Sequence, residues 1–367
     1  MVEDLSKTSM MLFANKVPIF IKFLILPLSV KAETCDNLEN QRVNMIRSLL
    51  LMFVMGLFTA SLSAQQDPQF TQWYMDHAMS NIAAAGNSDL IQVNGFYRNQ
   101  WVGLDRAPVT SLLNVNGKLG FMPGGFGIQF YQDELGFEGN TMAKAGYSYS
   151  LTPFAGGTTL SLGASVSYFS KTFKPEWLAI DDWTQDNAIP SDGETGSAID
   201  VDFGVYIAKP KTYYAGLSMT HIAQSELKDG GTIMSITPAR HFYAMGGYNF
   251  AIDGDILVLR TNLLAKTDFN ASAIDFNVNV IYDEMVWAGV SWRPGDAISP
   301  IAGLQYRLSS NDATSSKEQL FKVGYSFDAT TSELQTYSSG SHEFFLSYSF
   351  KFISTPILNR YANPRFL

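Results

Sequence analysis

Apolar and polar residues alternate along a series of short segments between residues 90 and 350. The segments IQVNGFYR (91–98) and IDVDFGV (199–205) are examples. Because successive side chains of a β-strand point to opposite faces, each segment would present one apolar and one polar face. A soluble β-sandwich could show the same alternation, but its connections would be of similar length at both ends. The pattern therefore predicts an all-β fold, and the connections decide which kind.

The connections are of two kinds. About fourteen segments alternate, each about as long as a tilted strand needs to cross a bilayer, and an even number is typical of bacterial outer-membrane barrels. Connections after even-numbered segments are mostly tight turns, such as 209–211, whereas those after odd-numbered segments include the long stretches 171–197 and 222–239. We therefore expect a transmembrane antiparallel β-barrel over residues 89–352, with short periplasmic turns and long outer loops. The expected strands begin near Leu90, Thr110, Phe126, Thr141, Leu160, Ile199, Tyr213, Phe242, Leu257, Ile274, Val286, Ala302, Phe321 and Phe344.

Composition agrees with a membrane barrel. Asp, Glu, Lys and Arg make up 16% of the chain, against roughly 25% in a soluble domain. Aromatic residues make up 13%, and the mean hydropathy is +0.00, which is too polar for a bundle of membrane helices. The formal net charge of -9 argues against a nucleic-acid partner.

The amino-terminal region carries the pattern of an export signal. Residues 45–64 combine a positive start, an apolar stretch and a small-residue end, so the mature chain is predicted to begin near Gln65. Met45 would then be the true start, and residues 1–44 would be an upstream extension produced by an error in the assigned gene start. A long leader is the alternative. Cys35, the only cysteine, lies in that extension, which leaves the mature chain without a thiol for a disulfide, a metal site or catalysis. The export signal and the barrel together predict that the protein lies in the cell outer membrane.

Four motifs follow one another along the mature chain: QDPQFTQ (66–72), NIAAAG (81–86), YRNQWVG (97–103) with APVT (107–110), and NPRFL (363–367). With these motifs the chain resembles the PorP/SprF family of outer-membrane proteins associated with the type IX secretion system. The family usually has Asn-Pro-Ala-Tyr-Ala-Gly in the second motif, where this chain has Ile82 and Ala84.

This resemblance implies a noncatalytic component of the type IX secretion system. Such a protein would help to secrete or anchor specific large surface proteins, such as adhesins used in gliding or attachment, by capturing clients and partners. The implied partners are outer-membrane lipid, the type IX translocon, the periplasmic ring or a peptidoglycan-binding lipoprotein, and a secreted surface protein with a C-terminal targeting domain. A rival interpretation is a channel or transporter for small or hydrophobic solutes, which barrels of this size also form.

The first strand and its loop contain one group of candidate residues. Arg98 and Gln100 would share the lumen face, and Trp101 would take the other face as an interfacial aromatic residue. Gly103 and Pro108 follow in the same motif region. A role in the fold is the main interpretation for this group, with contact to a partner as the alternative.

A second group of candidates lies outside the barrel wall and is predicted to bind partners. The segment 65–88 would lie on the periplasmic side or enter the lumen, where it would dock a partner or act as a plug. The acidic loop 181–186 would face outward, and the tail 353–367 would be periplasmic, sealing the lumen, carrying an assembly signal or meeting a partner. The residues are Asp67, Pro68, Gln69, Phe70, Thr71, Gln72, Trp183, Pro364, Arg365 and Phe366.

The sequence contains no recognisable catalytic or metal-binding motif. Its four histidines, His77, His221, His241 and His342, lie in separate segments without ligand spacing. We therefore expect no enzyme activity, no cofactor and no metal. Asp200, Asp202, Asp275, Asn277 and Asn279 recur at two-residue spacing, which is the inward face of a strand, with an ion path or calcium ligation as the alternative.

Overall fold

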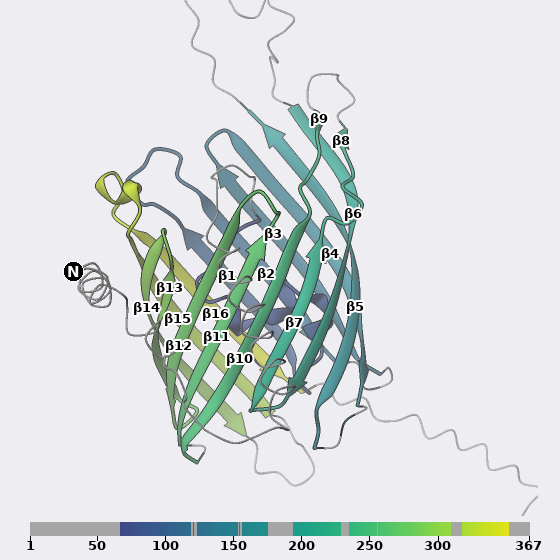
Figure 1. Cartoon of the computed structure of the whole chain (residues 1–367), viewed down its shortest axis with the longest axis vertical. Helices are drawn as coiled ribbons and strands as arrows, with labels where there is room; N and C mark the ends of the chain where they lie inside the picture. Colours follow the sequence, from purple (N-terminus) through teal and green to yellow (C-terminus); the bar gives the residue numbers. More distant parts are fainter. Residues whose placement is uncertain are drawn as a thin grey trace, which may run out of the picture. The chain divides into compact units, whose positions relative to one another are not determined.

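Fourteen long strands form a closed antiparallel barrel. The computed structural model describes residues 67–351 except 119, 121–122, 153, 155, 175–193, 229–234, 255 and 310–317. Within these residues, β1 pairs with β16 and β5 with β6, so the sheet closes on itself (Figure 1). The strands are β1 Ile91–Asn99, β2 Val109–Gly117, β3 Gly125–Leu135, β4 Glu138–Leu151, β5 Thr159–Phe173, β6 Glu194–Lys209, β7 Tyr213–Thr220, β10 His241–Asp253, β11 Leu257–Thr267, β12 Ser272–Tyr282, β13 Val286–Arg293, β14 Ala297–Ser309, β15 Glu318–Thr330 and β16 Ser341–Phe350.

The prediction of a barrel of about fourteen strands is confirmed. Two further strands, β8 (Leu227–Lys228) and β9 (Ser235–Ile236), pair with each other, and β8 also pairs with β6 at Ser197. The expected extension 1–44, the signal peptide 45–64, Trp183 and the tail residues Pro364, Arg365 and Phe366 lie outside the described residues.

The two ends of the barrel differ in their connections. Connections after odd-numbered strands include 100–108, 221–240 and 331–340, and we call this side the loop end. Connections after even-numbered strands include 210–212 and 283–285, and we call this side the turn end. The contrast agrees with the sequence pattern, and the assignment of the ends to outside and periplasm stays a prediction.

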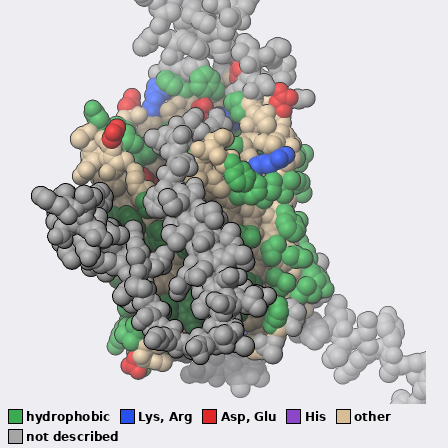
Figure 2. Space-filling view, viewed as in Figure 1, with side chains coloured by type: hydrophobic (Ala, Val, Ile, Leu, Met, Phe, Trp, Pro, Cys, Tyr) green, Lys and Arg blue, Asp and Glu red, His purple; other side chains and the backbone are tan. Residues whose placement is uncertain are grey.

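The two faces of the wall also differ in polarity. Outward-facing positions expose large apolar side chains, and Figure 2 shows such side chains spread over the visible wall. Examples are Leu113, Ile128, Val166, Ile199 and Leu217. The lumen face is polar, and the predicted inward residues Asp200, Asp202, Asp275, Asn277 and Asn279 are all buried there. Apolar side chains outside and polar side chains inside are typical of a membrane barrel.

The lumen is filled by the chain that precedes β1. Residues 67–90, which we call the luminal segment, contain three short 3₁₀ helices: η1 Trp73–Met75, η2 His77–Met79 and η3 Ile82–Ala84. With η5 (Glu333–Thr336), these are the helices of the described residues, and none is long and apolar enough to cross a membrane. The segment 65–88 was expected either on the periplasmic side or in the lumen. Its described part lies in the lumen.

Polar side chains start two of these helices. The Asp76 carboxylate accepts a hydrogen bond from the Ala78 N–H (3.1 Å), and the side-chain oxygen Oδ1 of Asn81 accepts one from the Ala83 N–H (3.0 Å). Both are N-cap bonds, which satisfy amide groups that a helix start would otherwise leave unpaired. The local sequence thus holds the luminal segment in compact turns.

Glycines on five neighbouring strands make room for η3. Gly127, Gly146, Gly163, Gly204 and Gly216 lie on β3 to β7. A Cβ added at any of these positions would lie within 2.8 Å of an atom of residues 81–83. At Gly163 it would lie 2.5 Å from the backbone nitrogen of Ala83. The wall can approach the luminal segment this closely because glycine has no side chain.

Candidate functional site: the luminal segment and its anchors

The QDPQFTQ motif is fixed to the loop end by one buried glutamate. The backbone N–H groups of Thr71 and Gln72 donate to the two carboxylate oxygens of Glu343, each at 2.7 Å. The Thr71 hydroxyl also donates to Asp328 at 2.8 Å. Thr71, Gln72 and Glu343 are all fully buried. Carboxylates that accept backbone amides in a dry environment make strong, directional bonds.

Arg98 links this motif to the wall. Its guanidinium contacts Asp328 at 2.6 Å and Glu343 at 3.0 Å, and it donates to the Thr71 hydroxyl at 2.9 Å. Only 1% of Arg98 is exposed, and its contacts with Thr71 of the luminal segment place its side chain on the lumen face of β1. Removing either partner of such a buried ion pair leaves the other charge uncompensated, which strongly destabilises the folded protein.

Arg293 extends the charged network across the lumen. It contacts Asp296 at 2.6 Å, Asp275 at 3.2 Å and Asp328 at 3.6 Å. The Gln69 carboxamide lies against the same guanidinium and accepts from it once its oxygen is assigned to that side. The upstream part of the luminal segment is therefore held by hydrogen bonds to a network of ion-paired side chains from β1, β12, β13, β15 and β16.

The middle of the luminal segment is held by asparagines. The Asp76 carboxylate accepts side-chain hydrogen bonds from Asn114 (2.5 Å), Asn94 (2.8 Å) and Asn116 (3.2 Å). Burial raises the pKa of Asp76, although the amides of Asn114 and Asn94 and the Ala78 N–H favour its charged form. The sequence alone gave no reason to select Asp76, because its donors come from two separate strands.

The downstream part is held by neutral groups. The Asn81 amide donates to the carbonyls of Val205 (3.0 Å) and Leu217 (3.2 Å). The hydroxyls of Ser148 and Ser218 donate to the backbone carbonyls of Ala83 (2.9 Å) and Ser80 (2.6 Å). These bonds satisfy backbone groups in the lumen that would otherwise be unpaired.

The remaining first-strand candidates lie in the loop rather than on the strand. β1 ends at Asn99, so the faces expected for Gln100 and Trp101 from strand alternation do not apply. The backbone N–H of Gln100 donates to the Pro108 carbonyl (2.9 Å). Trp101 adopts a positive φ of 51°, and its backbone N–H donates to the Ser341 hydroxyl. Gly103, with φ of 102°, takes a backbone conformation that glycine accommodates without strain. These residues shape the 100–108 connection, and partner contact by them stays a prediction.

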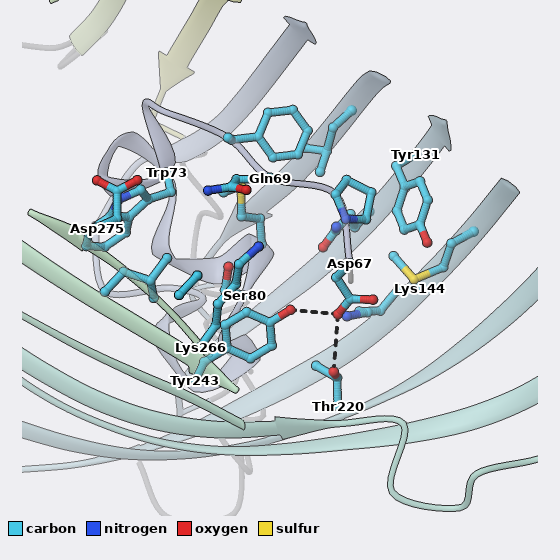
Figure 3. A pocket seen from close by; sticks show the side chains of 18 of the residues that line it. Asp67, Gln69, Trp73, Ser80, Tyr131, Lys144, Thr220, Tyr243, Lys266 and Asp275 are labelled. Carbon is cyan, nitrogen blue, oxygen red and sulfur yellow. Dashed lines mark hydrogen bonds between the residues drawn. The ribbon is translucent and has the colours of Figure 1, made fainter. Parts of the chain in front are cut away.

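A cavity of about 60 Å³ remains between the luminal segment and the wall. Figure 3 shows Asp67 in it, with its carboxylate accepting hydrogen bonds from the hydroxyls of Tyr243 (2.6 Å) and Thr220 (3.4 Å). Burial alone would raise the pKa of Asp67, but the nearby imidazoles of His241 and His221 and the Tyr243 hydroxyl hold it well below its usual range. Pro68, Gln69 and Phe70 line the same cavity.

Phe70 joins the luminal segment to an aromatic cluster. Its ring centroid lies 5.3 Å from that of Phe96, which in turn lies 4.9 Å from Phe345. Together with Trp73 and Tyr74, these rings form part of a buried apolar cluster inside an otherwise polar lumen. All six predicted residues from Asp67 to Gln72 therefore lie in the lumen against the wall.

The family model for the type IX secretion system membrane protein PorP/SprF matches residues 62–348. The chain belongs to the PorP/SprF family. The resemblance carried by the four motifs is thus confirmed, and the match includes the luminal segment and nearly all of the barrel. The chain is an outer-membrane β-barrel and a membrane component of type IX secretion, and family and fold are those of a secretion or membrane component rather than of an enzyme.

Solved outer-membrane proteins are among the structures to which this chain is similar, all at low identity. The "CymD monoaromatic hydrocarbon channel" is 12% identical, with a TM-score of 0.44 over 72% of this chain and 88% of its own. A Pseudomonas aeruginosa FadL homologue is 11% identical, with a TM-score of 0.42 over 79% of this chain and 100% of its own. The Ralstonia pickettii toluene transporter TbuX is 10% identical, with a TM-score of 0.41 over 77% of this chain and 94% of its own. No curated protein sequence matches significantly.

Proposed function

We propose that this PorP/SprF family member helps to secrete or anchor specific large surface proteins by capturing clients and partners at its loops and termini. The supporting observation is the filled lumen. The luminal segment is bonded to the wall near Thr71, Asp76 and Asn81, so in the part of the chain that the structure describes it occupies the space that a folded protein would need. A barrel filled in this way acts through its surfaces rather than as a protein conduit.

The loop end is the proposed capture surface for clients. It carries the long connections 221–240 and 331–340, and we expect the acidic segment 181–186 with Trp183 on the same side, because it lies between β5 and β6 in the sequence. An aromatic side chain among acidic residues offers both an apolar contact and charge complementarity to a client. Because Thr71 and Gln72 are fully buried, the QDPQFTQ motif acts as a plug in this arrangement, and docking by it would require the luminal segment to leave the lumen.

The partners proposed for the remaining surfaces follow from the family. The apolar outer wall would contact outer-membrane lipid. The tail, with Pro364, Arg365 and Phe366, would meet the type IX translocon and the periplasmic ring or a peptidoglycan-binding lipoprotein. The client would be a secreted adhesin with a C-terminal targeting domain, used in gliding or attachment, and residues 45–64 would direct export of the barrel itself.

One observation supports a second candidate, a channel for small or hydrophobic solutes. The cavity beside the luminal segment is lined partly by apolar side chains, including Phe70, Trp73, Leu112, Met142 and Leu264. An apolar pocket with a few polar groups is the usual form of a small-molecule site. Solute passage would also require the luminal segment to move.

The test is mass spectrometry of surface and culture-medium proteins from a strain that lacks this gene, compared with its complemented parent. Selective loss of one or a few large surface proteins, with accumulation inside the cell, supports client capture and identifies the client. An unchanged surface proteome contradicts the proposal and favours the solute channel.

A second arm tests the capture surface itself. The deletion strain is complemented with Trp183→Ala, and with Trp183→Phe as the matched control that keeps an aromatic ring. We expect Trp183→Ala to reduce the amount of client at the surface several-fold, while Trp183→Phe stays near the parent level. Equal surface levels in the two strains, at equal amounts of barrel in the outer membrane, would remove Trp183 from the capture surface.

A further inference from the structure

Two histidines and one aspartate meet at the loop end of the lumen, although they are distant in the sequence. Asp67 begins the described luminal segment, His221 follows β7, and His241 begins β10. Asp67 Oδ1 lies 3.4 Å from His221 Nε2, and Asp67 Oδ2 lies 3.8 Å from His241 Nδ1. One donor atom from each residue lies within 4.8 Å of the other two.

His241 is the most unusual member of this group. Only 4% of it is exposed, and neither ring nitrogen has a hydrogen-bond partner among the residues that the structure describes. Buried polar groups are nearly always paired. The Asp67 carboxylate is too far from His241 Nδ1 for a hydrogen bond, but two ligands of one tetrahedral ion with bonds of about 2.0 Å lie about 3.3 Å apart. A shared ion would therefore account for both the spacing and the missing partner.

His221 has the surroundings of a metal-bound imidazole. Its Nε2 faces Asp67, and its Nδ1 lies 3.5 Å from Asp200 Oδ2 on the opposite side of the ring. Neither His221 Nδ1 nor Asp200 Oδ2 has a hydrogen-bond partner in the described chain. A carboxylate behind a metal-bound histidine orients the ring and makes it a better ligand. Tyr243 orients the third ligand by donating to Asp67 Oδ2 at 2.6 Å.

We propose that Asp67, His221 and His241 bind a divalent first-row transition metal, with Zn²⁺ as the best fit. Two imidazoles and one carboxylate are a typical donor set for such ions, whereas Ca²⁺ and Mg²⁺ prefer oxygen ligands alone. Lys144 lines the same cavity but is paired with Asp202 at 2.8 Å. The cluster therefore offers one carboxylate and two imidazole nitrogens to a cation, and the charge of the nearby lysine is compensated by Asp202.

The ion would join three separate parts of the chain. It would tie the upstream end of the luminal segment to the 221–240 connection and to β10. The upstream end would then be fixed to the loop end of the barrel by metal ligation in addition to the hydrogen bonds of Thr71 and Gln72 with Arg98 and Glu343. This inference does not depend on the proposed role in client capture.

Zinc binding by the whole protein tests the proposal. The barrel is purified in detergent from its outer membrane, stripped with a chelator, and titrated with Zn²⁺ against a chromophoric competitor. We expect one Zn²⁺ per chain. His241→Ala and Asp67→Asn should each weaken the affinity at least tenfold, and Zn²⁺ should raise the Tm of the parent protein but not of these variants.

His342→Ala is the matched control, because His342 lies on β16 on the outer face and hydrogen-bonds Tyr325. Its zinc affinity should equal that of the parent. The heat-dependent gel mobility of the folded barrel confirms folding, and His241→Gln serves as a second variant if His241→Ala fails to fold. Absence of stoichiometric binding by the parent, or an equal loss of affinity in His342→Ala, would overturn the proposal.

Discussion

The two ends of the luminal segment are held to the wall by opposite kinds of interaction. The upstream end, around Thr71, depends on buried charges: Arg98, Asp328 and Glu343. The downstream end, around Asn81, depends on neutral hydrogen bonds and on glycine positions that let the wall approach closely. Charged anchors fail together when one member is lost, whereas neutral packing loses its contacts one by one. The comparison predicts that the segment is released more readily from the loop end than from the turn end.

Arg98→Met should have the largest effect. The substitution leaves Glu343 and Asp328 buried without their main counter-charge, which costs about 3–5 kcal/mol. The measurement is the free energy of unfolding in urea, followed by tryptophan fluorescence of the barrel in detergent. Lys118→Met is the control, because the Lys118 pair with Asp89 is solvent-exposed and such pairs contribute about 0–1 kcal/mol. Equal losses in the two variants would contradict the charged-anchor account.

Gly163→Val should disturb the downstream end. The new side chain would enter the space of the Ala83 backbone nitrogen, and overpacking of this kind costs about 1–3 kcal/mol. A cysteine placed at Ala84, in a background without Cys35, should react faster with a maleimide because η3 is displaced from the wall. Gly139→Val is the control, since nothing lies within 4 Å of a Cβ at Gly139 on the same sheet. A labelling rate that is unchanged by Gly163→Val would show that η3 does not depend on this close approach.

Asn81→Ala should have the smallest effect of the three. It removes two hydrogen bonds to wall carbonyls and the N-cap of η3, for a loss of about 1–2 kcal/mol. The same urea titration measures it. Asn87→Ala, at an exposed position just beyond η3, should change stability by less than about 0.5 kcal/mol. If Asn81→Ala destabilised the barrel as much as Arg98→Met, the two ends would not differ in the way proposed.

The strands of the wall were predictable because alternation repeats along every strand. The errors in the predicted strand starts have local causes. β6 begins at Glu194 rather than near Ile199, because five further residues continue the pairing with β5 beyond the clearly alternating part. β14 begins at Ala297 rather than near Ala302. It contains Pro300, which has no N–H to donate, and Ser299 and Pro300 have no partner on β15.

The contents of the lumen were less predictable, because they depend on contacts between distant residues. The QDPQFTQ motif marked the luminal segment, but nothing in its own sequence chose between a periplasmic and a luminal position. The inward side of Arg98 followed from alternation, whereas its partners Asp328 and Glu343 are more than 200 residues away. His221 and His241 lie in different elements from Asp67, so no spacing rule could bring the three together.

The position of the luminal segment bears on how the barrel assembles. The segment leads directly into β1, and β1 closes the sheet by pairing with the last strand, β16. Glu343 and Asp328, which hold the segment, come from β16 and β15, the last strands to be synthesised. Wrapping the wall around the segment before this seam forms avoids threading it through a completed ring. We expect the luminal segment to serve as a core around which the barrel closes, because the pairing of β1 with β16 brings Glu343 to Thr71 and Gln72.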